Sequence, residues 1–87
     1  MRDGSRYHGE FKDGEIHGKG MRVFEDGTEY VGDFQMGEKH GYGEITYGQR
    51  NWKEEYYKGS WNMNVRSGYG QLMLRSGVLY KGNFENH

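Results

Sequence analysis

The sequence predicts an all-β fold, an elongated single-layer antiparallel β-meander built of tandem β-hairpin repeats of about 23 residues. Three observations predict it. A Tyr-x-Gly-x-aromatic segment occurs four times, a Gly-x-Gly segment follows the first three copies at a constant distance, and no apolar stripe of helical period interrupts them. The chain has 16 glycines in 87 residues, and a glycine weakens a helix wherever it occurs.

The tyrosine that opens each segment defines the repeat. Tyr7 and Tyr30 are 23 residues apart, as are Tyr57 and Tyr80, whereas 27 residues separate Tyr30 from Tyr57. This longer spacing places an insertion at residues 48–56. The chain, 1–87, is therefore predicted to be a single domain. Its units are residues 7–29, 30–56, 57–79 and a partial unit at 80–87.

Each unit is predicted to form one hairpin. Alternation along the first strand places the tyrosine, the glycine and the second aromatic residue on one face, and mostly polar residues on the other. The paired glycines of the second strand leave space that an aromatic ring from a neighbouring strand can fill. We therefore expect a continuous row of rings over the glycines. The row consists of Tyr7, Tyr30, Tyr57, Tyr80, Phe11, Phe34, Trp61 and Phe84.

The connections carry turn residues. Gly14, Gly37 and Asn64 occupy one column of the repeat, where a residue that tolerates positive φ is expected. Asp26-Gly27 and Ser76-Gly77 suit the tight turns that join successive units. Each hairpin should then contact only its sequence neighbours.

These motifs closely resemble the MORN (membrane occupation and recognition nexus) repeat, whose pattern is Tyr-x-Gly-x-Phe/Trp-x-x-Gly-x-x-His/Asn-Gly-x-Gly. The resemblance covers residues 2–87, with Asn64 replacing the loop glycine and Ser67 replacing the histidine in the third unit. It implies a twisted β rod without catalytic activity that serves as a protein–protein interaction scaffold in a cytoskeletal or ciliary (axonemal) assembly. The alternative is a peripheral module that attaches to anionic phospholipid membranes.

The amino-acid composition limits the classes of partner that we expect for this chain. The net charge is −1 with both signs interspersed, so the sequence has neither the basic footprint expected for nucleic acid nor a polybasic run for anionic lipid. Cysteine is absent, which excludes disulfides and thiolate metal sites. No signal peptide and no 18-residue apolar run is found, so we expect a cytoplasmic protein. The resemblance places it at the cytoskeleton or in a cilium.

The sequence does not predict a catalytic site. His17 and His40 share a repeat column that Ser67 fills in the third unit, which favours hydrogen bonding in a loop over catalysis. A nucleophile needs an oriented base beside it, and Gly-x-Gly indicates a phosphate site only before a helix. Zinc held by His17 and His40 is a weaker alternative. We predict no catalytic residue, cofactor, metal or small-molecule substrate.

Five residues that the repeat does not explain are predicted to contact a protein partner. Tyr42 and Tyr69 lie between paired glycines on the opposite face, Met36 and Met63 lie in hairpin loops, and Trp52 lies in the insertion. Exposed aromatic and methionine side chains are typical of interfaces. The alternative is local packing over the sheet, with Trp52 folding back onto a nearby tyrosine.

Both ends of the chain fall inside a repeat. Asp3-Gly4 ends one unit, and residues 84–87 stop after a single strand. An open sheet edge invites pairing with another strand. We therefore expect self-association, or pairing with a partner, through the edges of the sheet.

Overall fold

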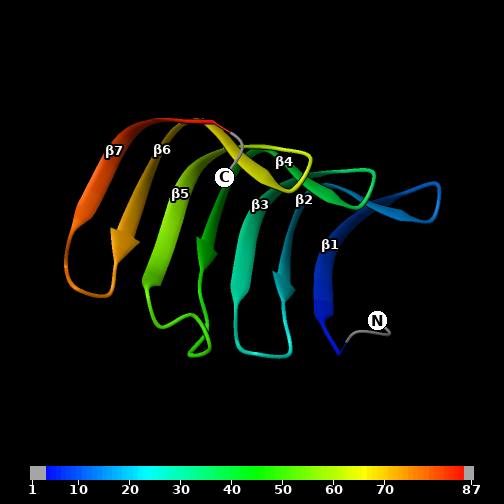
Figure 1. Cartoon of the computed structure of the whole chain (residues 1–87). Helices are drawn as coiled ribbons and strands as arrows, with labels where there is room; N and C mark the ends of the chain where they lie inside the picture. Colours follow the sequence, from blue (N-terminus) through cyan, green and yellow to red (C-terminus); the bar gives the residue numbers. More distant parts are fainter. Residues whose placement is uncertain (1–3, 86–87) are drawn as a thin grey trace.

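The chain forms one sheet of seven antiparallel strands paired in sequence order (Figure 1). The structure is a computed structural model that describes residues 4–85, and the predicted end residues Asp3, Asn86 and His87 lie outside this range. The strands are β1 (Arg6–Lys12), β2 (Glu15–Val23), β3 (Glu29–Gln35), β4 (Glu38–Thr46), β5 (Glu54–Asn62), β6 (Val65–Leu74) and β7 (Leu79–Phe84). No helix able to cross a membrane occurs among residues 4–85. The predicted single-layer meander is confirmed.

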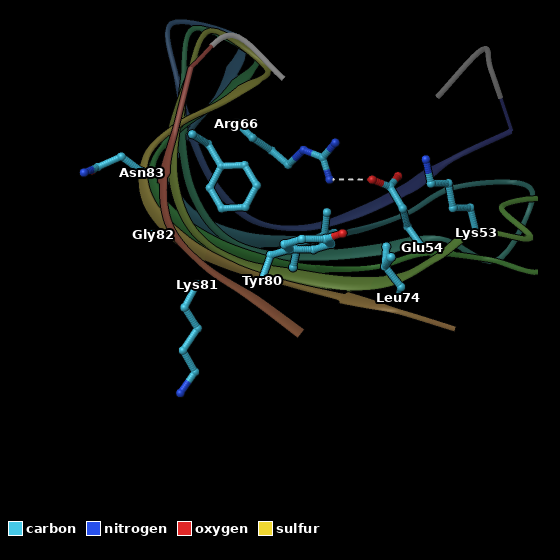
Figure 2. Close-up of a pocket in the computed structure, with 10 residues that line it drawn as sticks. Lys53, Glu54, Arg66, Leu74, Tyr80, Lys81, Gly82 and Asn83 are labelled. Atoms are coloured by element: carbon cyan, nitrogen blue, oxygen red, sulfur yellow. Dashed lines mark hydrogen bonds and ion pairs between the residues drawn. The ribbon is translucent and has the colours of Figure 1, made fainter. Parts of the chain in front are cut away.

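The sheet is elongated, with extents of 40 × 25 × 16 Å, and curves along its strands (Figure 2). Tyr80 and Leu74 lie inside the curve, whereas Lys81 projects from the other side. We call the inner surface the concave face and the opposite one the outer face. The other tyrosines of the repeat occupy the position equivalent to Tyr80 in their strands and therefore lie on the same face of the sheet. The predicted aromatic row thus occupies the concave face.

A row of glycines crosses the sheet at its bend. A Cβ on Gly32, for example, would lie 2.5 Å from the carbonyl oxygen of Tyr42, so a larger residue would push the strands apart. The strands therefore approach each other closely along this line. The register pairs neighbours along the series Gly9, Gly20, Gly32, Gly43, Gly59, Gly70 and Gly82.

The tyrosine of each complete hairpin lies over the glycine of the paired strand, as predicted. The ring of Tyr57 covers Gly70, and Tyr30 covers Gly43 in the same way. Both tyrosines have no exposed surface. The rings then continue edge to face from hairpin to hairpin, with neighbouring centroids 5.0–5.6 Å apart, a favourable arrangement for aromatic pairs. This aromatic ladder runs in the order Phe11, Tyr7, Phe34, Tyr30, Trp61, Tyr57, Phe84.

Two residues predicted to carry the fold contribute little burial. Phe11 is 64% exposed and Tyr80 is 54% exposed. They lie in β1 and β7, the edge strands, where no further strand covers the outer side of the ring. Phe11 still belongs to the predicted row, whereas for Tyr80 the prediction was wrong, because no ring contact of Tyr80 occurs among residues 4–85. Self-association through the same edges stays a prediction.

The loops fall into two sets. The tip loops, at residues 13–14, 36–37 and 63–64, close the hairpins through residues with positive φ. The rim loops, at residues 24–28, 47–53 and 75–78, join one hairpin to the next. The predicted insertion at 48–56 spans most of the middle rim loop, and its last three residues belong to β5. They fit into the strand through a bulge between Glu54 and Tyr56.

Each hairpin also has a register shift beyond the glycine row, at Glu10, Asp33 and Ser60. The bulged residue leaves backbone groups without ladder partners. In the second hairpin the Tyr30 hydroxyl donates to the carbonyl oxygen of Asp33 at 2.8 Å. The backbone N–H of Tyr42 donates to the Asp33 carboxylate at 3.1 Å. The repeated tyrosine therefore has two roles. Its ring covers a glycine, and its hydroxyl donates a hydrogen bond to the carbonyl oxygen of the bulged residue.

Asp33 should make folding pH-dependent. Its hydrogen bond from Lys19 is the main cause that lowers its pKa, with the Tyr42 N–H acting in the same direction. A lowered pKa contributes stability above the unfolded value of about 4, and this contribution is lost as the pH falls through the folded value. We expect Asp33→Asn to lower the free energy of unfolding by about 1 kcal/mol at pH 7, because an amide oxygen accepts more weakly than a carboxylate.

Urea unfolding of wild type and Asp33→Asn at pH 7 and pH 3 checks this expectation. The difference between the two proteins should be smaller at the lower pH, because the stability contributed by the Asp33 charge is lost as the pH falls below the unfolded pKa towards the lowered folded one. Glu15→Gln, at an exposed position beside the first tip loop, is the matched control and should change stability little. A difference of the same size at both pH values would contradict the role given to the Asp33 charge.

Candidate binding surface on the concave face

The concave face carries a cation among the aromatic rings. Lys39, on β4, points to the same side as the ladder because it is opposite Phe34 in the register. Its Nζ lies 5.4 Å from the ring centroid of Trp61, 5.6 Å from that of Phe24 and 5.8 Å from that of Tyr30. These are distances at which an ammonium is attracted to the face of a ring.

Lys39 is held in this aromatic cage without an anionic partner among residues 4–85. Burial lowers the pKa of the ammonium, and the positive charge of Arg22 adds to this effect. Arg22 itself stacks over Phe24 at 4.9 Å and donates to the Ser5 hydroxyl at 3.1 Å. The middle of the concave face is thus apolar, aromatic and positively charged.

Arg66 occupies the position equivalent to Lys39 in the next unit, but it is paired. Its guanidinium donates to the Glu54 carboxylate at 2.9 Å and to the Tyr47 hydroxyl at 3.3 Å. Burial disfavours ionised Glu54, but hydrogen bonds from Asn51 and Arg66 outweigh it and lower its pKa. Burial raises the pKa of Tyr47 to about 12. This network stabilises both charges, so Arg66 is less available than Lys39 to an outside anion.

Two hollows open on this face. The larger, of about 480 Å³, lies beside the Arg66–Glu54 pair and is walled by Tyr80 and Leu74 (Figure 2). The second, of about 370 Å³, lies towards the rim loops and is lined by residues that include Phe24, Ile45 and Tyr47. Both combine apolar walls with a few polar groups, the usual character of a binding surface.

The five predicted contact residues lie on three separate surfaces. Tyr42 and Tyr69 are 54% and 58% exposed on the outer face. Met36 and Met63 are exposed at the tip loops, and Trp52 is 81% exposed in a rim loop. The predicted exposure is confirmed, and Trp52 does not fold back onto a tyrosine. The five residues do not form a common site, and whether any of them binds a partner stays a prediction.

The rim loop that carries Trp52 is anchored rather than free. Arg75 donates to the carbonyl oxygens of Asn51, Tyr47 and Gly48 at 2.9–3.0 Å. The backbone N–H of Gly48 donates to the Thr28 hydroxyl at 2.9 Å. The loop therefore presents the indole of Trp52 from a fixed position.

Sequence reasoning missed Lys39 and Arg66 as residues of the concave face. A signal was present, because each lies two positions before the first glycine of a Gly-x-Gly pair, on the same strand face as those glycines. The clustering of Lys39 with Phe24 and Trp61 comes from three different strands or loops. That clustering depends on the register between hairpins.

No group of three or more His, Cys, Asp and Glu side chains able to hold a metal ion occurs among residues 4–85. The weaker zinc alternative is therefore unsupported for the described part of one chain. Neither hollow on the concave face contains a histidine. The arrangement is suited to binding an apolar or anionic group.

The fold and the surface define a class, the tandem β-hairpin repeat arrays whose single sheet offers an aromatic concave face. A family model for the MORN repeat matches residues 7–29, 30–51 and 57–78. The chain belongs to the MORN repeat family, whose repeats are generally non-enzymatic protein- or membrane-binding modules. A search of curated proteins finds no match.

Proposed function

We propose that this protein is an interaction scaffold whose concave face binds a partner-protein segment bearing apolar side chains and a carboxylate. The observation that carries this proposal is the aromatic cage around Lys39. Its ammonium is partly desolvated but has no anionic partner among the described residues. A carboxylate placed beside it would form a charge-assisted contact in a partly dehydrated setting, where such contacts are strongest.

The apolar part of the partner would contact the rings and hollows that flank Lys39. Tyr80 is 54% exposed beside the larger hollow, and Tyr47 and Ile45 line the second. Exposed aromatic surface is typical of the centre of a protein interface. An acidic, amphipathic segment therefore fits this face better than a basic or purely polar one.

A selection of random peptides tests this proposal, because it requires no identified partner. A phage library of random 16-residue peptides would be panned on the immobilised chain, and enriched peptides measured by fluorescence anisotropy. We expect enriched peptides to combine Asp or Glu with aromatic or aliphatic residues. Lys39→Met should weaken their binding about tenfold, equivalent to about 1.4 kcal/mol, because methionine keeps the apolar stem but removes the charge.

Lys58→Met is the matched control, since Lys58 is exposed and follows Tyr57 in β5, so its side chain lies on the outer face. It should leave the affinity unchanged. Enrichment of basic peptides, or equal affinities for Lys39→Met and wild type, would contradict the proposal. Urea unfolding of both variants would establish that the sheet is intact.

The cellular setting is also part of the proposal. A role in a cytoskeletal or ciliary assembly rests on the resemblance to the MORN family, and the concave face supplies the surface through which a scaffold would hold its partner. Imaging of the tagged chain in ciliated cells addresses this point. A diffuse distribution that no binding-face substitution alters would speak against it.

Attachment to a membrane surface is the second candidate, and Trp52 favours it. Its indole is 81% exposed in an anchored loop, between Arg50 and Lys53 in the sequence. Tryptophan and basic residues together are typical of the membrane–water interface. In the same series of experiments, sedimentation with phosphatidylserine vesicles that Trp52→Ala abolishes would favour the membrane function. If neither the wild type nor Trp52→Ala sediments with the vesicles, the result would favour the protein-binding function.

A further inference from the structure

The second and third tip loops border one small cavity. Its volume is about 90 Å³, and Met36, Met63 and His40 line it with Gln35 and Glu38. Two methionines and one histidine thus line the same space. Thioethers are soft donors that select copper(I), and imidazole also suits copper.

The two methionines are unexpected residues for their backbone positions. Met36 has φ of 50° and Met63 has φ of 48°, and Asp13 holds the same position in the first tip loop. Turns of this kind prefer asparagine, aspartate or glycine, and a bulky residue with positive φ is uncommon. The side chains are also 68% and 61% exposed. Neither turn formation nor core packing therefore explains the methionines.

Asn64, in the third tip loop, is bound to β4 close to the second tip loop. Its backbone N–H donates to the carbonyl oxygen of Lys39 at 2.9 Å, and its side-chain oxygen accepts from the Lys39 N–H at 2.8 Å. Met63 precedes Asn64, and His40 follows Lys39. This double contact fixes the backbones of two donor residues relative to each other. The repeat pattern has glycine at this position, and glycine could not make the side-chain hydrogen bond to Lys39 that Asn64 makes beside this cavity.

We propose that Met36, Met63 and His40 form a binding site for a soft monovalent metal ion, copper(I). The two sulfur lone pairs and the lone pair of neutral imidazole would coordinate the ion, with no change in its oxidation state. Hard ions such as Mg²⁺ and Ca²⁺ require several oxygen ligands, and Glu38 is the single carboxylate that lines this cavity. Structural zinc sites use cysteine, histidine or carboxylate rather than thioether.

Silver(I), a redox-stable analogue of copper(I), provides the first test. The chain with ¹³C-labelled methionine methyl groups would be titrated with silver nitrate in a chloride-free buffer. The methyl resonances of Met36 and Met63 should shift together and saturate at one equivalent. Those of Met21 and Met73, which lie on strands away from the cavity, serve as internal references and should not move.

Variants separate a metal site from a merely apolar patch. Met36→Leu, Met63→Leu and His40→Gln should each weaken silver binding about tenfold or more, since loss of a group that only orients a metal ligand already costs that much. Leucine preserves the apolar volume, so these variants should remain folded. His8→Gln is the matched control, because His8 lies in β1 and lines a hollow that contains neither Met36 nor Met63. It should bind silver like wild type.

Copper(I) itself would be tested anaerobically with ascorbate, by competition against a chromogenic copper(I) chelator. One equivalent should be withdrawn from the chelator by wild type, and none by the double variant Met36→Leu/Met63→Leu. Equal shifts of all methionine resonances, equal binding by that double variant, or silver binding without copper(I) binding would each overturn the proposal. The peptide-binding experiments do not involve this cavity, so the two proposals can fail separately.

Discussion

Replacing Tyr30 by alanine is expected to lower the free energy of unfolding by about 3–5 kcal/mol, as for other large buried aromatic side chains. Tyr30 has no exposed surface, and its ring contacts both Phe34 and Trp61 at centroid distances of 5.0 and 5.6 Å. Its hydroxyl also satisfies the carbonyl oxygen of Asp33 at the bulge. The substitution removes packing and leaves a polar group of the backbone without its partner.

Tyr80→Ala is the matched control because Tyr80 occupies the same column of the repeat. It is 54% exposed in the edge strand β7, so its loss should cost less than about 1 kcal/mol. Urea unfolding followed by tyrosine and tryptophan fluorescence measures both differences. If Tyr30→Ala does not fold, Tyr30→Phe removes the hydroxyl alone and should cost about 1 kcal/mol. Equal losses for Tyr30→Ala and Tyr80→Ala would contradict the structural account of the ladder.

The arrangement of the hairpins could be predicted from the sequence because the repeat encodes it locally. Tyr57 and Gly70 lie in strands of the same hairpin, and a period of two places both on the concave face. The empty space above a strand glycine predicts a covering ring. The positive φ values of Gly14, Gly37 and Asn64 follow in the same way from the residue types at the turns.

Other features could not be predicted, because they depend on position in the sheet or on contacts between hairpins. Phe11 repeats the motif of Phe34 but is exposed, because it lies in an edge strand. The cage around Lys39 brings together residues from separate hairpins. The positive φ of Met36 contradicts its side-chain type, so no residue preference indicated it. These are the features on which the binding and metal-site proposals rest.

Gly70→Ala is expected to lower the free energy of unfolding by about 3 kcal/mol, near the upper end of the usual cost of overpacking. Gly70 has an ordinary φ, so the added methyl group causes no backbone strain. It would instead lie 2.6 Å from Cε1 of Tyr57. That ring is fully buried between Trp61 and Phe84, with centroid distances of 5.2 and 5.0 Å, and has little room to move.

Gly20→Ala is the matched control for position in the sheet. Its partner ring, Tyr7, belongs to the edge strand β1, where the ring can move outward. We expect a smaller loss there, of about 1 kcal/mol. Both variants would be measured by urea unfolding under the conditions used for the tyrosine substitutions.

A double-mutant cycle then identifies the cause of the Gly70→Ala loss. In a Tyr57→Leu background the ring is absent, so the added methyl should cost about 2 kcal/mol less than in wild type, a coupling within the range of residues in contact. That coupling would mean that the ring of Tyr57 is what requires glycine at this position. Additive losses would mean instead that the close approach of the backbones at Gly59 and Gly70 requires it, and the aromatic ladder would then be a consequence of the glycine row.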